Sequence, residues 1–240
     1  MKQTLPAAFD HAKIASELAA LDRGEAKSYR VKLLAMLRQH LAAATTKIEQ
    51  DFYSSNDGAI YVGQHARCID GLLTLLYDEA GKLMPQSHDI AVIAVGGYGR
   101  GEMAPFSDID VMFLMPAKIS KKHEAAIEFM LYMLWDLGLK VGHSVRRVQD
   151  CVEEANKDMQ SKTALIESRL VVGAAELFGR MEHQVDNKCV KPFVDKYIAL
   201  RIEDQSARRK KYGNAVTMQE PNIKNGCGGL RDYQNLRWMM

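Results

Sequence analysis

A short segment in the middle of the chain limits the possible folds more than any other part of the sequence. Residues 90–95 form an apolar, β-branched run, which is typical of a strand buried on both faces. This run leads directly into a glycine-rich turn, GGYGRGE, at residues 96–102. A second apolar run, residues 109–115, follows soon after, with Asp108 and Asp110 at its start. The pattern predicts two strands of one sheet, joined by a glycine turn.

The two aspartates are spaced for metal binding. Alternate residues of a strand point to the same face, so Asp108 and Asp110 are expected to direct both carboxylates into one small volume. Close carboxylates repel each other unless a cation lies between them. Mg²⁺ favours oxygen ligands and often takes one or two carboxylates together with substrate phosphates. The pair therefore predicts a site for one or two Mg²⁺ ions and a nucleoside triphosphate.

The glycine turn supplies the complementary half of such a site. Gly96 and Gly97 carry no side chain, so their backbone N–H groups can approach phosphate oxygens. Arg100 could form a forked contact with a phosphate, and a helix starting near Tyr98 would add its positive end. The turn is neither a Walker A loop nor a dinucleotide-binding fingerprint, because both need different spacings. We interpret it as a phosphate-binding turn of another kind.

Composition describes an ordinary globular protein. The chain has 240 residues, of which 47% are hydrophobic and 26% charged, and its net charge is +2. A nearly neutral chain is not typical of proteins that coat nucleic acid. The cysteines (Cys68, Cys151, Cys189 and Cys227) are scattered without a C-x-x-C pair, which favours a reducing cytoplasm over a disulfide framework. No apolar run approaches the roughly 20 residues that span a bilayer, and residues 1–9 lack a signal core.

Periodicity divides the chain into three regions. Helical spacing fills most of residues 11–50 and 59–80, with Gly81 expected just past the second stretch. The middle region combines the two strands with a helix at 121–137 and a third strand at 139–145. Helical patterns dominate residues 148–212, including 163–172 and 190–209.

These patterns predict an α/β (α+β) fold with a small mixed sheet and helical N- and C-terminal regions. We expect an N-terminal helical region at 1–58, a core at 59–150 and a second helical region at 151–240. Residues 230–240 read as a helix without a stop signal, which predicts that the chain is part of a longer protein.

The glycine turn followed by Asp-x-Asp resembles the DNA polymerase beta-like nucleotidyltransferase superfamily. The sequence is more closely similar to the transferase region of the bifunctional protein-PII uridylyltransferase/uridylyl-removing family. Four stretches carry the similarity: 96–102 with 107–110, 134–138 with 141–146, 164–169, and 220–224 with 228–232.

This resemblance implies transfer of UMP from UTP to a tyrosine of the PII signal protein, in nitrogen regulation. Family members place a hydrolase domain and glutamine-sensing domains after this region, so uridylyl removal is not expected here. The candidate catalytic and metal-binding residues are Asp108 and Asp110. The candidate nucleotide-binding residues are Gly96, Gly97, Arg100 and Ser107.

Several alternatives stay open. The superfamily usually takes a third carboxylate from a later strand, but residues 139–145 contain none, and His143 and Ser144 stand there instead. Glu102, Asp150 and Glu167 are the candidates for a replacement. His143 could contact phosphate, although a histidine on a short strand is more often structural. The acceptor could be another protein or a small molecule, or the chain could bind nucleotide without turnover. We expect neither a membrane nor a nucleic acid as partner.

Overall fold

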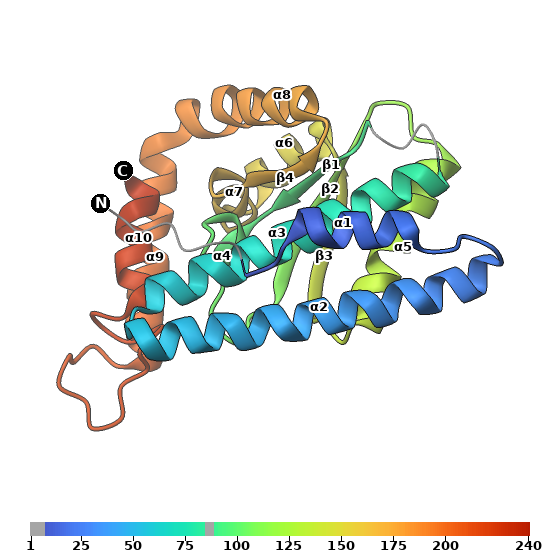
Figure 1. The fold of residues 1–240 in the computed structure, drawn as a ribbon. Coiled ribbons are helices and arrows are strands. Elements are labelled where there is room, and N and C mark those ends of the chain that lie inside the picture. The colour runs from blue at the N-terminus through green and yellow to red at the C-terminus, as the bar shows by residue number, and fades with distance from the viewer. Residues whose placement is uncertain (1–7, 85–88) are drawn as a thin grey trace. The chain divides into compact units, whose positions relative to one another are not determined.

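The computed structural model describes residues 8–84 and 89–240 (Figure 1). These residues form two compact units. The first unit comprises the described residues up to 149 together with 167–180, and the second comprises 150–166 and 181–240. Within the described residues, no helix is both long enough and apolar enough to cross a bilayer. All four cysteines are free thiols, and three of them are buried.

Three helices begin the first unit: α1 (His11–Ala20), α2 (Ala26–Ser55) and α3 (Gly58–Leu83). The carboxylate of Asp57 accepts hydrogen bonds from the N–H groups of Ala59 and Ile60, so α3 begins with a side-chain cap. The expected end of this helix at Gly81 is wrong. Gly81 is buried inside α3, and the helix continues to Leu83, because tertiary packing outweighs the local preference of glycine for a helix end.

A four-stranded sheet forms the centre of this unit, in the order β3-β2-β1-β4. The strands are β1 (Ala91–Ala94), β2 (Ile109–Met115), β3 (Val141–Arg147) and β4 (Arg169–Gly173). β1 pairs antiparallel with both β2 and β4, whereas β2 and β3 are parallel. The predicted mixed sheet is therefore confirmed, and β2 has the bounds expected from its apolar run.

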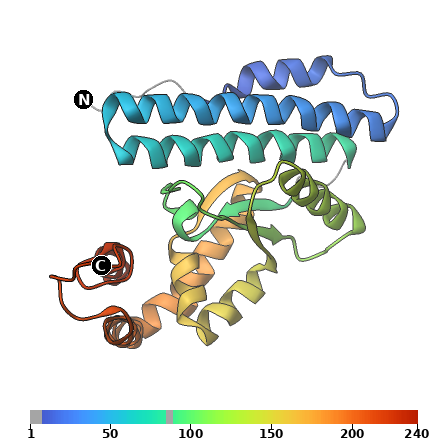
Figure 2. The same cartoon turned by 90° about the horizontal axis from the view of Figure 1, so that it is seen from below.

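The helices cover one face of the sheet. Figure 2 shows α1, α2 and α3 packed together on that face, and α5 (Lys121–Asp136) lies against it as well. Side chains of alternate strand residues, such as Val111 and Phe113, join the core with Leu72 of α3 and Leu134 of α5. Met112 and Leu114 are buried on the opposite face of β2 and lie outside this core. The alternation fixes which residues of β2 face away from the helices.

The expected helix at 163–172 is only partly correct. α7 (Met159–Ile166) ends early, and the chain then forms β4, a strand that the sequence analysis missed. β4 is stabilised by long-range pairing with β1, which a local periodicity cannot reveal. A Cβ on Gly173 would lie 2.2 Å from the carbonyl oxygen of Ile90, so only glycine fits where β4 ends.

The second unit is helical. Its elements are α6 (Val148–Lys157), α7, the second half of α8 (Ala175–Val185), α9 (Val194–Tyr212) and α10 (Leu230–Met239). Arg201 of α9 is buried, and its guanidinium stacks over Trp238 of α10 at 4.6 Å. It also donates hydrogen bonds to Thr163 of α7 and to Asp204, so one side chain joins three helices.

Candidate active site

The carboxylate of Asp110 lies between two glycines. A Cβ on Gly142 would be 2.6 Å from Oδ1, and a Cβ on Gly96 would be 3.4 Å from Oδ2. Asp110 and Gly142 are direct partners in the parallel pairing of β2 and β3. On the other side, the N–H of Val95 donates to the carbonyl oxygen of Asp110 at 3.0 Å. The structure thus brings the glycine turn and Asp110 together, with Gly142 as a neighbour that the sequence did not single out as part of the site.

Asp108 stands immediately before β2. Asp108 and Asp110 are both exposed, whereas Ile109 between them is buried in the core, as strand alternation requires. Ser107 is also exposed, and its N–H donates to the carbonyl oxygen of Ala104 at 3.1 Å, which closes the turn before the strand. The chain therefore presents the two carboxylates and the serine hydroxyl on an accessible edge.

The glycine turn forms a single helical turn, α4 (Gly96–Gly99), which starts two residues earlier than expected. Gly96 has a φ of +59°, a conformation that favours glycine. A Cβ on Gly99 would lie 2.3 Å from the carbonyl oxygen of Glu167, so close backbone packing also requires a glycine there. The first N–H groups of a helical turn have no partner within it. Those of Gly96 and Gly97 are such groups.

Arg100 is held by two carboxylates. Its Nε donates to Glu102 at 2.7 Å, and its Nη1 donates to both oxygens of Glu167 at 2.8 Å. The side chains of Arg100 and Glu167 are only 14% and 8% exposed. Burial lowers the pKa of Arg100, but these hydrogen bonds outweigh it and raise the pKa above its usual value. The sequence did not indicate this pairing, which fastens the glycine turn to the residues before β4.

The same pairing bears on the open question of a third metal ligand. Glu102 and Glu167, two of the candidates, are both engaged with Arg100. Among residues 8–84 and 89–240, no three His, Cys, Asp or Glu side chains gather as a metal site. Two exposed carboxylates still fit Mg²⁺, since this ion often completes its shell with water and substrate phosphates.

A second, partly buried hydrogen-bond network supports the turn. The hydroxyl of Tyr98 donates to Asp70 of α3 at 2.7 Å, and Arg169 of β4 donates to both oxygens of Asp70 at 3.0 Å. Burial raises the pKa of Tyr98 well above its usual range, and the charge of Asp70 raises it further. The network joins α3, α4 and β4. The sequence analysis did not predict this network.

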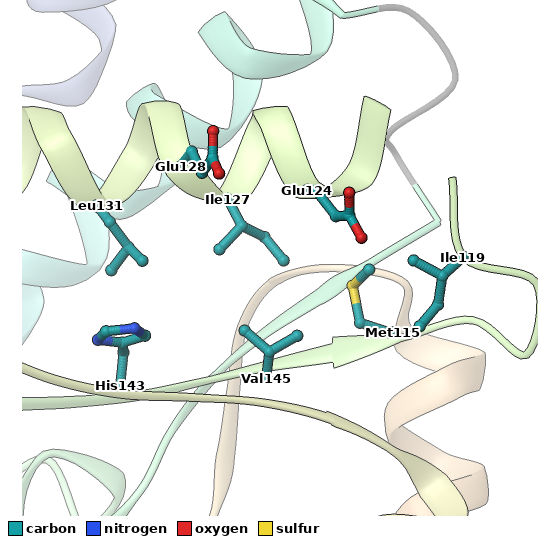
Figure 3. Close-up of a pocket in the computed structure, with 8 residues that line it drawn as sticks. All are labelled: Met115, Ile119, Glu124, Ile127, Glu128, Leu131, His143 and Val145. Atoms are coloured by element: carbon teal, nitrogen blue, oxygen red, sulfur yellow. The ribbon is translucent and has the colours of Figure 1, made fainter. Parts of the chain in front are cut away.

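His143 lies away from the candidate site. It pairs in register with Val111, whose side chain belongs to the core, so its ring is on the opposite face of the sheet from Asp110. Figure 3 shows His143 and Val145 pointing from β3 toward Leu131 and Ile127 of α5. These residues line a pocket of about 330 Å³. The ring also contacts Trp135 edge-on at 5.8 Å. This placement favours the structural interpretation of His143.

Comparisons with known proteins agree with this geometry. Residues 78–171 match the family model described as a nucleotidyltransferase domain. Residues 196–240 match the model described as GlnD PII-uridylyltransferase.

Several curated relatives carry the name bifunctional uridylyltransferase/uridylyl-removing enzyme. The protein from Azospirillum brasilense is 37% identical over 95% of this chain and 25% of its own length. The protein from Ruegeria pomeroyi is 39% identical over 92% of this chain and 25% of its own length. The protein from Rhodopseudomonas palustris is 34% identical over 100% of this chain and 27% of its own length.

The sheet, the glycine turn and the family match define the class: residues 78–171 form a nucleotidyltransferase domain. Within that class the chain is similar to the bifunctional uridylyltransferase/uridylyl-removing enzymes, and the resemblance seen in the sequence is confirmed. The chain spans about a quarter of the length of these relatives.

Proposed function

We propose that this chain catalyses Mg²⁺-dependent transfer of UMP from UTP to a tyrosine of the PII signal protein, in the cytoplasm. The observation that carries this proposal is the position of the Asp110 carboxylate, between the phosphate-binding turn at Gly96 and the neighbouring strand at Gly142. The names of the relatives and of the family model support the uridylyl group and the PII protein, whereas UTP and the tyrosine belong to the proposal alone.

The side chains have distinct roles in this proposal. Asp108 and Asp110 hold Mg²⁺, which when bound neutralises charge on the triphosphate. The N–H groups of Gly96 and Gly97 donate to the β- and γ-phosphates, and the exposed hydroxyl of Ser107 adds a further donor. Nη2 of Arg100 would lie 3.6 Å from a Cβ on Gly97, so this nitrogen is the part of the guanidinium that is positioned for phosphate contact.

The reaction needs no covalent intermediate on the protein. The tyrosine oxygen forms a bond to the α-phosphorus, the bond from that phosphorus to the leaving oxygen breaks, and pyrophosphate departs. The phenolic proton passes to solvent. The chain contributes by placing donors and carboxylates before the reaction, so that little reorganisation is needed as charge develops.

Substitution of Asp110 tests the proposal. Asp110→Asn keeps the shape of the side chain and removes its charge, so we expect transfer of labelled UMP to PII to fall by at least about 100-fold. Circular dichroism should show an unchanged fold. Asp22→Asn is a matched control, because Asp22 is 80% exposed and lies in the segment between α1 and α2. Near-normal transfer by Asp110→Asn would refute the assignment.

Two other outcomes correspond to the alternatives. If pyrophosphate is released only when the acceptor is a different protein or a small molecule, the class of enzyme holds and the acceptor changes. If calorimetry shows binding of UTP with Mg²⁺ but no pyrophosphate appears with any acceptor, the chain is a nucleotide-binding module. Both experiments use the same purified protein, so their results can be compared directly.

A further inference from the structure

A groove of about 510 Å³ lies between the end of α2, the start of α3 and the loop that leads into β2. All of these segments belong to the first unit. Six of the lining residues carry the argument: Glu49, Phe52, Tyr53, Tyr61, His65 and Phe106. None of them takes part in the candidate active site, although Phe106 stands two positions before Asp108 in the chain.

The rings along this groove form a continuous wall. The centroids of Phe52 and Tyr53 are 5.6 Å apart, and the ring of Tyr61 meets Phe52 edge-on at 5.8 Å. His65 continues the row, 6.0 Å from Tyr61. Tyr53 is 76% exposed, so the wall is open to solvent at the end of α2. Such an accessible group of aromatic rings is typical of a binding surface.

Phe106 lines the groove on the side of the loop that leads into β2. Its side chain is 94% exposed, and its φ of +63° is a conformation that bulky residues rarely adopt. The loop is fastened to α3, since the N–H of Met103 donates to the carbonyl oxygen of Val62 at 3.3 Å. The carbonyl oxygen of Met103 also lies 3.3 Å from Nδ1 of His65. The backbone therefore holds an aromatic ring in solvent beside the other rings.

The groove carries one uncompensated negative charge. Glu49 is exposed, and its carboxylate forms no hydrogen bond or ion pair with any residue that the structure describes. The nearby cation Lys47 is already paired with Asp51 at 2.5 Å. Burial lowers the pKa of His65, so this ring supplies no positive charge to the groove at neutral pH. Burial and the charge of Glu49 together raise the pKa of Tyr61.

Aromatic faces beside an unpaired carboxylate form an environment that suits an organic cation, because the ring faces and the carboxylate both attract positive charge. We propose that this groove binds an arginine or lysine side chain of the acceptor protein and so positions the acceptor near Asp108 and Asp110. The inference rests on the proposed function for the identity of the partner. The groove is linked to the candidate active site through Phe106, which lines it and stands two positions before Asp108 in the chain.

The binding step can be tested without turnover. The probe is acetyl-arginine methylamide, and its neutral isostere, acetyl-citrulline methylamide, is the control ligand. Both are titrated into the whole chain carrying ¹³C-labelled Phe and Tyr, with the ring signals followed by NMR. We expect the arginine probe to shift the signals of Tyr53 and Phe106, and the citrulline probe to bind at least about 5-fold more weakly. Glu49→Gln should reduce arginine binding by a similar factor.

Matched variants and a second ligand make the test decisive. Glu25→Gln changes an exposed glutamate at the opposite end of α2 and should leave binding unchanged. Equal binding of the two probes, or full arginine binding by Glu49→Gln, would overturn the proposal. Stronger shifts with uridine than with arginine would also overturn it, by assigning the groove to the base of the nucleotide.

A kinetic measurement then connects the groove to the acceptor. In transfer assays, Glu49→Gln and Phe106→Ala should raise the KM for the acceptor protein by about 5-fold each, with the KM for UTP unchanged. A change in the KM for UTP alone would contradict the assignment. If the chain shows no transfer at all, the proposed function fails, whereas the NMR titration still decides whether the groove binds cations.

Discussion

Asp110 and Gly142 are so close that a Cβ on residue 142 would lie 2.6 Å from Oδ1 of the carboxylate. The two residues are partners in the parallel pairing of β2 and β3, and paired residues direct their side chains to the same face. The missing side chain at position 142 therefore provides the space that the carboxylate occupies. The geometry of the candidate active site therefore depends on Gly142, which has no reactive side chain and contributes only space.

Gly142→Ala should separate activity from stability. The added methyl group would displace the Asp110 carboxylate. Because the Asp110 side chain can rotate away, the fold can tolerate the change, but the carboxylate leaves its position in the candidate site. Alanine is also slightly better than glycine in a strand, by about 0.5 kcal/mol. We expect UMP transfer to fall by roughly 100-fold, with the free energy of unfolding in urea unchanged or slightly raised.

Ser144→Ala is the matched control for this change, because Ser144 lies two residues further along the same face of β3. Its activity should stay close to that of the unmodified chain. Full activity of Gly142→Ala would mean that the Asp110 carboxylate works equally well in a second position. The close approach of Asp110 and Gly142 would then not be needed for transfer.

Gly99→Ala should have the opposite effect and destabilise the fold. A Cβ at this position would lie 2.3 Å from the carbonyl oxygen of Glu167 and 3.0 Å from that of Ala94. Both neighbours are backbone atoms and cannot rotate away, so the turn must shift. We expect the free energy of unfolding to fall by about 2 kcal/mol in urea titrations.

Gly179→Ala serves as the comparison for Gly99→Ala. Gly179 lies within α8, and a Cβ added there would meet no neighbouring atom within 4 Å. Alanine should stabilise the helix there by up to about 1 kcal/mol. Equal effects of the two substitutions on the free energy of unfolding would show that the close contact of Gly99 with Glu167 does not determine stability at the turn.

Tyr98→Phe tests the partly buried network of Tyr98, Asp70 and Arg169 that supports the turn. The substitution removes one hydrogen bond to the charged Asp70, which keeps its two bonds from Arg169. A hydrogen bond to a charged group contributes about 2 kcal/mol, so we expect a loss of that size in the free energy of unfolding. Tyr132→Phe removes a hydroxyl from a side chain that is 49% exposed and should change little. A loss equal to that of Tyr132→Phe would show that the network does not stabilise the fold.

The sequence predicted those parts of the fold that depend on local pattern. The segments that form β1 and β2 were recognisable as continuous apolar runs, and α5 was recognisable by the helical spacing of its apolar residues. β4 was missed because its pairing with β1 depends on residues about 80 positions away, and local spacing around Leu170 and Val171 also fits a helix.

The candidate site shows the same division. The positions of Gly96 and Asp110 followed from motif chemistry, because strand alternation and the glycine turn are local properties. The engagement of Arg100 with Glu167 did not follow, since it joins two segments that only the folded sheet brings together. Gly142 illustrates the point most clearly, because its importance arises from a register between strands that no single segment encodes.

The buried thiol of Cys68 predicts a specific loss of stability at alkaline pH. Burial raises the pKa of Cys68 to about 12, from an ordinary value of 9.0. In this interval the unfolded chain releases the proton and the folded chain retains it, so the folded state binds more protons. The free energy of unfolding must therefore fall as pH rises above 9, while it is unaffected by this group at lower pH.

Urea titrations at pH 8, 9 and 10 measure this effect. The tyrosines also titrate at alkaline pH, but they change the free energy of unfolding equally in every variant compared. Cys68→Ala should be less stable than the unmodified chain at pH 8, because it leaves a small cavity in α3. Between pH 9 and pH 10, however, the free energy of unfolding of Cys68→Ala should fall by about 1 kcal/mol less than that of the unmodified chain, because the titrating thiol is gone. Cys227→Ala, which changes a partly exposed cysteine in the loop before α10, should keep the original slope. Parallel pH profiles for Cys68→Ala and the unmodified chain would contradict the prediction.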